Sequence, residues 1–561
     1  MTGMEDKKAK FLASKHVHPG MNIGEYTRDV EATLADLDRR DIVRRIWQKD
    51  HTVWKSEPTE ISNRLGWLTV TELISDNIGN FLTFAKEVKK AKFPNVILLG
   101  MGGSSLGPEV LRQTFGSAKG FPELIVLEAG ACIVPTHMQA IADAIEPLDT
   151  LFLVSSKSGS TIEPLSLSDY FINLLQTAIG KEKAGQNMVA ITDPESPLVR
   201  LAEETGFDRV YLNPPDIGGR YSVLSAFGLV PAALIGINIS LLLERAETMR
   251  EACASSVPVH ENPGAWLGAY MGTLALKGRD KLTLLISPAI SSFGLWVEQL
   301  IAESTGKEGK GIVPIVDEPL VDPDHYTSDR LFVYLRLRGD DNSVLDTAVE
   351  RIRASGHPLL TLEMRDKYDL GAEFFRWEFA TAVAGTILGI NPFDQPDVMR
   401  AKDATERVLQ EFQKSGGFQH LESVGSLGKL LSQAQKGSYL AIMAYVCQST
   451  EMDEAFGALR RRIVEQYHIA TTLGYGPRFL HSTGQLHKGG PNTGLFLQIT
   501  ADHEEDIPVP VKPYTFGILA DAQVLGDFES LQLLKRTVMR VHFTRGDEED
   551  ILKLIYGLKR G

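Results

Sequence analysis

The chain has 561 residues, of which 43% are hydrophobic and 23% charged, and its formal net charge at pH 7 is −14. This length exceeds what one hydrophobic core supports, so we expect two or three domains. The acidic balance argues against general nucleic-acid binding, which needs cations against a phosphate backbone, and the absence of an 18-residue apolar run argues against a membrane helix. The three cysteines are Cys132, Cys253 and Cys447, and they are scattered without the spacing of metal ligands. This pattern is typical of free, buried thiols in a reducing compartment and favours a soluble cytoplasmic protein.

Four segments follow one another along the chain. Residues 1–90 carry apolar side chains at helical spacing among charges, which predicts a helical N-terminal segment. Residues 91–255 and 256–402 each alternate short apolar runs with amphipathic stretches, which predicts two α/β domains with parallel sheets. Residues 403–561 are predicted to form a helical and mixed extension that completes the second domain and the active site. It is predicted to be helical over 403–470 and over 525–540, with a strand within 478–499.

Nine strands are predicted within the two α/β domains. In the first domain they lie at 95–99, 124–127, 151–154, 188–191 and 209–212. In the second they lie at 282–286, 312–316, 331–337 and 359–362, with a helix over 293–304. Ligands of such sheets bind at the carboxyl ends of the strands, so the loops that follow these strands are the first places to search for chemistry.

A hydroxyl-rich turn follows the strand at 151–154. Residues 155–161 contain four Ser, one Thr, one Gly and one Lys, and an amphipathic pattern opens at Ile162. Free backbone N–H groups and the helix dipole at such a turn suit a phosphate. The alternative is a capped helix start without a ligand. Five hydroxyls around Lys157 favour the phosphate.

The Gly-rich sequence GMGGSSLG at 100–107 resembles a dinucleotide-binding fingerprint only loosely, because Ser105 stands where the third glycine belongs. Nicotinamide binding is therefore disfavoured. Further along, Gln299 and Glu303 are four residues apart and share a helix face. Arginine, lysine and histidine stand in DIGGRYSVLSAFG (216–228), NPFDQPDVMRAK (391–402) and RFLHSTGQLHKGGPNTGLFLQI (478–499).

Together these motifs resemble the phosphoglucose isomerase family. GMGGSSLGP is similar to its first loop, SSKSGSTIEP to its phosphate loop, DIGGRYS to its arginine signature and QLIAESTGK to the helix of its catalytic base. FDQPDVMRAK resembles its lysine signature, and LHSTGQ the histidine motif of some bacterial members. The resemblance is strongest to the isomerase half of bacterial transaldolase–phosphoglucose isomerase fusions, although no transaldolase barrel fits into the first ninety residues.

Two departures from the family pattern affect the transfer of roles. The histidine motif follows the lysine signature here, whereas in most of the family it precedes it. Asp397 and Met399 replace the usual Gly and Glu of the lysine signature. The role of the histidine therefore has two candidates, His481 and its rival His325.

The resemblance implies two doubly wound parallel-sheet sugar-isomerase (SIS-type) domains with extra helical segments. It implies the reversible isomerisation of glucose 6-phosphate to fructose 6-phosphate, a reaction of glycolysis and gluconeogenesis, by ring opening and a glutamate-mediated proton transfer through a cis-enediol. No metal or cofactor is required. The implied catalytic residues are Glu303, His481, Lys402 and Arg220, and the implied substrate- or phosphate-binding residues are Gly103, Ser104, Ser156, Lys157 (through its backbone), Ser158, Thr161, Gln299 and Gln395.

The partners and two rival functions remain open at this point. The family implies a homodimer in which the histidine reaches the neighbouring subunit, but the displaced histidine motif also allows a single chain to complete its own site. A functional link to a separate transaldolase follows from the fusion resemblance. A bifunctional glucose/mannose-6-phosphate isomerase and a non-catalytic sugar-phosphate-binding regulatory module are the alternative functions, and the second needs no Glu303 or Arg220.

Overall fold

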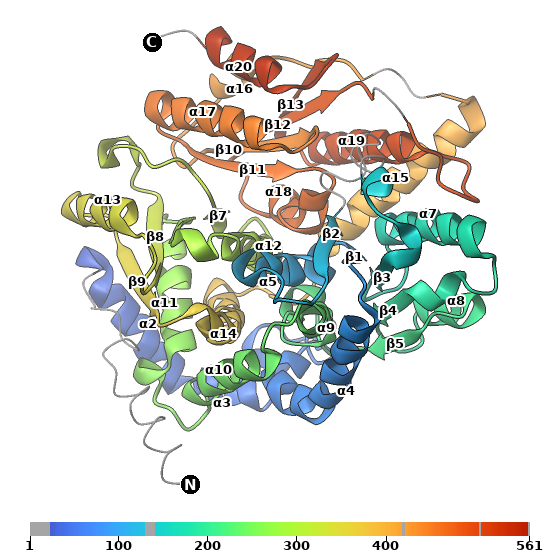
Figure 1. The fold of residues 1–561 in the computed structure, drawn as a ribbon. Coiled ribbons are helices and arrows are strands. Elements are labelled where there is room, and N and C mark those ends of the chain that lie inside the picture. Colours follow the sequence, from blue (N-terminus) through green and yellow to red (C-terminus); the bar gives the residue numbers. More distant parts are fainter. Residues whose placement is uncertain (1–22, 129–140, 418–420, 504–505, 559–561) are drawn as a thin grey trace.

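The computed structural model describes residues 23–128, 141–417, 421–503 and 506–558, and the described residues form three parallel sheets (Figure 1). The predicted α/β class with parallel sheets is thus confirmed, and one sheet more than predicted is present. None of the described helices is both long and apolar enough to cross a membrane. Cys253 is buried as a free thiol, Cys447 is half-buried, and Cys132 lies outside the described residues.

The first sheet has the strand order β2-β1-β3-β4-β5. Its strands are β1 (Asn95–Gly100), β2 (Glu123–Glu128), β3 (Thr150–Ser155), β4 (Met188–Thr192) and β5 (Arg209–Leu212), and its helices are α5 (Leu106–Phe115), α7 (Ile162–Ile179) and α8 (Pro197–Thr205). Every residue of β3 is buried, as expected of a parallel strand covered on both faces. Gly100 pairs in register with Ser155, so the loops that follow β1 and β3 begin side by side.

The second sheet has the order β7-β6-β8-β9. Its elements are β6 (Lys281–Ile286), α12 (Phe293–Thr305), β7 (Val313–Ile315), β8 (Arg330–Leu337), α13 (Ser343–Ala354) and β9 (Leu359–Met364). All nine predicted strands are present, and their ends differ from the predicted ones by at most two residues.

The third sheet, with the order β11-β10-β12-β13, corrects the prediction for residues 403–561. Its strands are β10 (Tyr439–Tyr445), β11 (Ala470–Tyr475), β12 (Gly494–Ala501) and β13 (Thr537–Phe543), and the helices of this part of the chain are α15 (Pro396–Ser415), α16 (Leu427–Leu431), α17 (Thr450–Tyr467), α18 (Gly484–Gly489), α19 (Phe516–Leu533) and α20 (Glu548–Gly557). The helical prediction over 403–470 was wrong at β10, and the helix predicted to reach residue 540 ends at Leu533, before β13. A short, wholly buried apolar run such as β10 cannot be told from a buried helix by periodicity. We call residues 427–558 the third unit.

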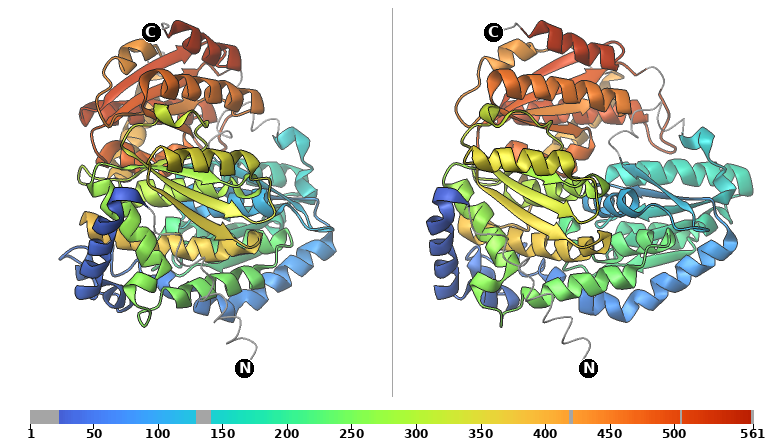
Figure 2. Two further views of the ribbon diagram at one scale, coloured as in Figure 1. Left: turned by 90° about the vertical axis from the view of Figure 1, so that its left-hand side faces the viewer. Right: turned by 60° about the vertical axis from the view of Figure 1, so that its left-hand side comes forward.

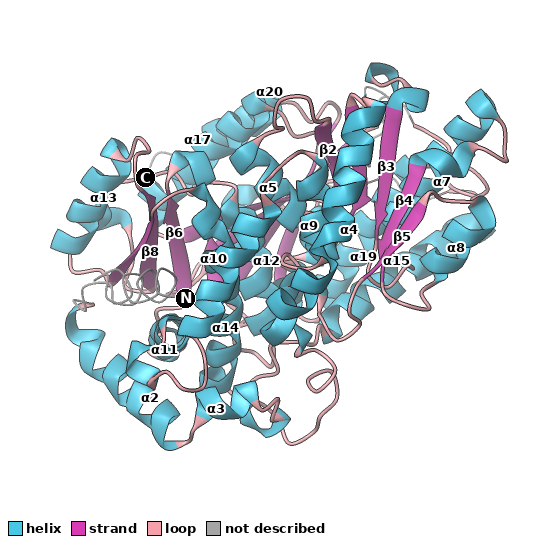
Figure 3. Ribbon diagram, turned by 60° about the horizontal axis from the view of Figure 1, so that its bottom comes forward, coloured by secondary structure: helices cyan, strands magenta, loops and turns pink. Residues whose placement is uncertain are grey.

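We call the first sheet with its helices the first unit, and the second sheet with its helices the second unit. Helices outside the sheets connect these two units. They are α2 (Thr27–Arg39), α3 (Ile42–Trp47) and α4 (Val70–Ala91), followed later by α9 (Ala226–Leu234), α10 (Ile239–Ala252), α11 (Pro263–Leu276) and α14 (Leu370–Leu388). The N-terminal segment is helical as predicted, but Asp41, at φ 56°, separates α2 from α3. α14 packs against both α10 and α11, and Figure 3 shows the three helices near one another.

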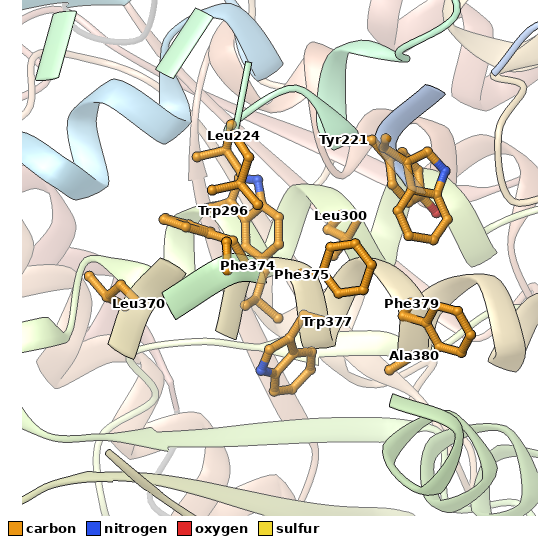
Figure 4. Close-up of a cluster of buried hydrophobic side chains, with 14 of the residues drawn as sticks. Tyr221, Leu224, Trp296, Leu300, Leu370, Phe374, Phe375, Trp377, Phe379 and Ala380 are labelled. Carbon is orange, nitrogen blue, oxygen red and sulfur yellow. The ribbon is translucent and has the colours of Figure 1, made fainter. Parts of the chain in front are cut away.

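An aromatic cluster fixes the helix that carries the predicted catalytic base. Trp296 of α12 meets Phe374 of α14 edge to face, with ring centroids 4.9 Å apart (Figure 4). Leu300 lies one turn further along α12 and is fully buried in the same cluster. Since such interiors are packed as densely as organic crystals, α12 has little freedom to shift.

The third unit is packed against both other units (Figure 2). Phe516 and Leu519 of α19, with Leu409 of α15, join the hydrophobic core formed by β1, β3 and α7. On the side of the second sheet, the guanidinium of Arg460 in α17 donates to the carbonyl oxygens of Val316 and Asp317, each at 2.8 Å. The third unit is therefore held to the other two by apolar packing on one side and by a buried cation on the other.

We expect Arg460→Met to lower the free energy of unfolding by about 3 kcal/mol, because it leaves buried carbonyl oxygens without a donor. Arg460 is 3% exposed, whereas its neighbour Arg461 is exposed and donates to Leu320 O. Arg461→Met is the matched control and should cost less than about 1 kcal/mol. Denaturant unfolding of both variants measures the difference, and equal losses would contradict the role of Arg460 in holding the units together.

Candidate functional site

The hydroxyl-rich turn lies between β3 and α7, at the carboxyl edge of the first sheet. Ser156 is 2% exposed, and within the described residues its hydroxyl has no hydrogen-bond partner. Ser158 is exposed and Thr161 half-buried, with their side-chain oxygens 3.4 Å apart. A buried hydroxyl without a partner is costly unless a ligand satisfies it. The turn is therefore a candidate anion site at the N-terminus of an 18-residue helix.

The side chain of Lys157 is turned to a different partner. Its ammonium forms an ion pair with Asp193 and donates to Pro215 O at 3.2 Å. The backbone of Lys157, rather than its charge, is what this turn offers to an anion.

The Gly-rich loop after β1 joins this turn to the arginine motif. Ser155 Oγ donates to Ser104 O at 3.0 Å, which ties the two loops together. A Cβ on Gly103 would lie 2.1 Å from the carbonyl oxygen of Gly219, so only glycine fits there. This close approach brings the loop against the backbone that carries Arg220.

Arg220 and Glu303 form a buried ion pair, with the guanidinium Nη1 3.2 Å from Glu303 Oε1. Gln299, one turn earlier on α12, donates through Nε2 to Glu303 Oε2 at 3.1 Å. Arg220 is 3% exposed, Gln299 3% and Glu303 7%. The predicted shared face of Gln299 and Glu303 is present, and it meets the arginine.

The loop that precedes α15 is held by two buried cations. Arg220 donates through Nη1 to Gln395 Oε1 (2.8 Å), and through Nη2 to Pro392 O (2.8 Å) and Asp394 O (2.9 Å). Lys307, just beyond α12, is paired with Asp394 at 2.6 Å and is 3% exposed. Burial, together with the charge of Arg220, lowers the pKa of Lys307 to about 7, although Asp394 opposes the change.

His481 enters the site from the third unit. β11 ends at Tyr475, and the short 3-10 helix Arg478–His481 follows it. Gln299 Nε2 donates to the backbone oxygen of His481 at 2.8 Å, and His481 Nε2 lies 2.9 Å from Glu163 Oε1. Glu163, in the first turn of α7, is 2% exposed. One chain therefore carries a continuous contact path from Glu303 through Gln299 and His481 to the helix of the hydroxyl-rich turn.

The structure brings most of the predicted residues together, with one departure. Lys402 lies on α15 and is exposed, and within the described residues no hydrogen bond or ion pair connects it to Arg220 or Glu303. Its predicted part in ring opening remains a prediction. The imidazole of the rival, His325, stacks on His468 with ring centroids 5.3 Å apart, in contact with the third unit rather than with Glu303.

The two basic residues after His481 are part of the support. His487 is 3% exposed, and burial lowers its pKa well below the ordinary value. Lys488 pairs with Asp527 at 2.5 Å, and both side chains are 1% exposed. α18 is further fixed by Gln485, whose Nε2 donates to Gly306 O at 3.0 Å. Among the described residues, none of these three side chains has a hydrogen bond or ion pair with Glu303, and α18 packs against the end of α12.

The sequence analysis did not identify three residues of the site, which are Glu163, Lys307 and Gln523. The amide of Gln523 donates to Glu163 Oε1 at 2.6 Å. Glu163 follows the phosphate turn directly, but an acidic residue in the first turn of a helix is common and signals no function. Lys307 belongs to ESTGK, where a lysine after a helix end is equally ordinary. Gln523 lies in an unremarkable part of α19. Among the described residues, no group of three or more His, Cys, Asp or Glu side chains is placed to hold a metal ion.

Comparisons with known proteins agree with this arrangement. The sequence matches the family model described as phosphoglucose isomerase over residues 83–315, which includes Arg220, Gln299 and Glu303 and ends before the third unit. Two solved structures share the fold: a hypothetical protein of Thermus thermophilus (TM-score 0.59, 23% identity, 69% of this chain and 98% of that one) and a glucose-6-phosphate isomerase of Chlamydia trachomatis (TM-score 0.58, 17% identity, 73% and 96%).

Similar sequences carry one name. A glucose-6-phosphate isomerase of Staphylococcus saprophyticus is 30% identical over 380 residues, covering 60% of this chain and 85% of the relative. One from Lactococcus lactis subsp. cremoris is 28% identical over 386 residues, with the same coverage. The motifs, the parallel sheets that carry them and these relatives lead to one assignment: the chain belongs to the phosphoglucose isomerase family.

Proposed function

We propose that this chain interconverts glucose 6-phosphate and fructose 6-phosphate. The observation that carries the proposal is the buried Arg220–Glu303 pair, 3.2 Å apart, in contact through Gly103 with the loops at the carboxyl edge of the first sheet. A non-catalytic sugar-phosphate-binding module needs an anion site but no buried carboxylate paired with a guanidinium. The pair therefore favours an enzyme.

The groups of the site match the needs of an aldose–ketose isomerisation. Ser156, Ser158 and Thr161, with the Lys157 backbone, bind the phosphate, so that remote binding energy positions the reacting carbons. Glu303 moves the proton between C1 and C2. The charge of Arg220 stabilises the enediolate oxygens as negative charge develops on them.

His481 serves ring opening of the cyclic aldose. The O1 proton passes to the imidazole as the C1–O5 bond breaks and C1=O forms, and the same proton then passes to O5. Gln299 and Gln395 contact Glu303 and Arg220 respectively, and they orient these groups toward the substrate. Glucose and mannose 6-phosphate differ in configuration at C2, and a coupled assay with each sugar phosphate separates a monofunctional from a bifunctional isomerase.

We propose that a single chain builds the site. His481 contacts Glu163 and Gln299 of its own chain, at 2.9 and 2.8 Å. This geometry supports the single-chain alternative over a histidine donated by a partner subunit. A homodimer and a link to a transaldolase remain predictions that do not enter the chemistry.

We expect Glu303→Gln to retain substrate binding and to lose about three to five orders of magnitude in kcat, because the group acts in the transition state. Steady-state kinetics in both directions measure this. Glu308→Gln is the control, since Glu308 pairs with Lys55 at the surface, and its kcat should match that of the wild type. If Glu303→Gln keeps more than a tenth of the wild-type turnover, Glu303 is not the base.

Ser156→Ala should raise KM by about ten- to hundredfold, the range for losing a hydrogen bond to a charged group. Its thermal midpoint should stay unchanged, because the hydroxyl has no protein partner to lose. Competitive inhibition by inorganic phosphate should weaken in parallel. Thr177→Ala, near the far end of α7, is the control. An unchanged inhibition constant would place the phosphate in the 100–107 loop instead.

Mixing Glu303→Gln chains with His481→Ala chains should restore no activity, because each chain lacks one group of its own site. Light scattering on the mixture shows whether the chains associate, and co-refolding from denaturant allows subunits to exchange. The wild type, refolded in the same way, is the control for recovery. Regained activity would show that the site is shared between chains.

A further inference from the structure

A glutamine of the third unit contacts the carboxylate that holds the site histidine. Gln523, on α19, is 3% exposed, and its Nε2 donates to Glu163 Oε1 at 2.6 Å. His481 Nε2 lies 2.9 Å from the same oxygen. Two nitrogen atoms, both from the third unit, therefore converge on one oxygen of a buried carboxylate in the first unit.

The charge state of Glu163 determines which atoms carry hydrogen. Burial raises the pKa of Glu163, but the charge of His481 and the hydrogen bonds from His481 and Gln523 outweigh it, so the pKa lies below its usual value. An ionised carboxylate only accepts hydrogen bonds. The amide of Gln523 must then present its nitrogen, and His481 must carry hydrogen on Nε2. In the neutral imidazole, the form that can accept a proton, Nδ1 then carries no hydrogen and is the ring nitrogen available to a substrate.

Gln523 has no other polar contact that would explain its burial. Within the described residues its Oε1 has no hydrogen-bond partner, and neither has Glu163 Oε2. A glutamine side chain can make four hydrogen bonds, and burying one that makes a single hydrogen bond lowers the stability of the fold. Such a residue is expected where its one hydrogen bond has a functional role. Other titratable groups surround the Glu163–His481 pair. Tyr445 and Tyr514 face Glu163, and Glu303 is linked to His481 through Gln299. Further out, Tyr445 is near Arg540 and Asp527, and Asp527 is paired with Lys488.

We propose that Gln523 is a positioning residue for His481: its amide keeps Glu163 a pure acceptor, and thereby holds the imidazole in the tautomer whose Nδ1 accepts the proton during ring opening. This inference rests on the proposed function, because it assigns the setting of the same histidine. It also gives α19 an indirect part in the reaction, through Glu163 and His481.

The test uses the full chain and the variant Gln523→Met, which keeps the volume and removes the donor. We expect kcat/KM for cyclic glucose 6-phosphate to fall about tenfold, and the acid limb of its pH profile to move up by about one pH unit, because Glu163 loses a donor and its pKa rises. A 5-deoxy ketose 6-phosphate has no hydroxyl to close a furanose ring, and its kcat/KM should fall less than threefold. Ser530→Ala is the control on the same helix, since that hydroxyl donates only to Gly526 O.

Three results separate the possible failures. A wild type without isomerase activity overturns the proposed function itself. An active wild type together with an unmoved acid limb in Gln523→Met, or equal losses on the cyclic and the open-chain substrate, overturns the role of Gln523 alone. The tautomer of His481 can also be measured in the wild type, so that no substitution can disturb the fold. The measurement uses the ¹⁵N resonances of protein labelled at histidine, and the signals missing from the spectrum of His481→Gln identify those of His481. Hydrogen on Nδ1 and none on Nε2 would overturn the inference, and hydrogen on Nε2 is the expected result.

Discussion

The buried guanidinium of Arg220 is the interaction on which the site depends. Its Nε donates to Ser304 Oγ at 2.8 Å, and its other nitrogens contact Glu303, Gln395 and the carbonyl oxygens of Pro392 and Asp394. Burying such a charge is costly unless its N–H groups are all satisfied. Here four hydrogen bonds and the ion pair with Glu303 compensate the charge, with partners from α12 and from the loop before α15. The cost of burial thus enforces the meeting of elements that are far apart in the sequence.

The third unit contributes the other polar side chains of this site. His481 and Gln523 come from different elements of that unit, and both contact Glu163 in the first. Their geometry therefore depends on how firmly the third unit is seated. The apolar contacts of Phe516 and Leu519 fix it against α7, and Arg460 fixes it against the second sheet. Forces that hold the units together also set the position of the histidine.

Much of this could be predicted from the sequence, because parallel strands and their loops carry local signals. The apolar runs before the Gly-rich and hydroxyl-rich loops placed β1 and β3 within one residue, and the i, i+4 spacing placed Gln299 beside Glu303. The third sheet could not be predicted in the same way, since the wholly buried β10 has no period that marks it as a strand. Lys402 and Lys307 show the limit for single residues. Both are lysines near motif ends, and only the packing makes one exposed and the other buried.

The contacts of Arg220 also suggest how its charge reaches the intermediate. With its other N–H groups on fixed partners, the contact with Glu303 at 3.2 Å is the longest of the five, and it joins the arginine to the group that changes charge during the reaction. In the proposed reaction, Glu303 becomes neutral when it accepts the proton from carbon, and it then no longer balances the guanidinium. The positive charge then acts on the enediolate oxygens at the moment when they become negative. In this proposal the guanidinium keeps its protein partners, and a charge fixed in place before the reaction is the condition under which electrostatic catalysis is most effective.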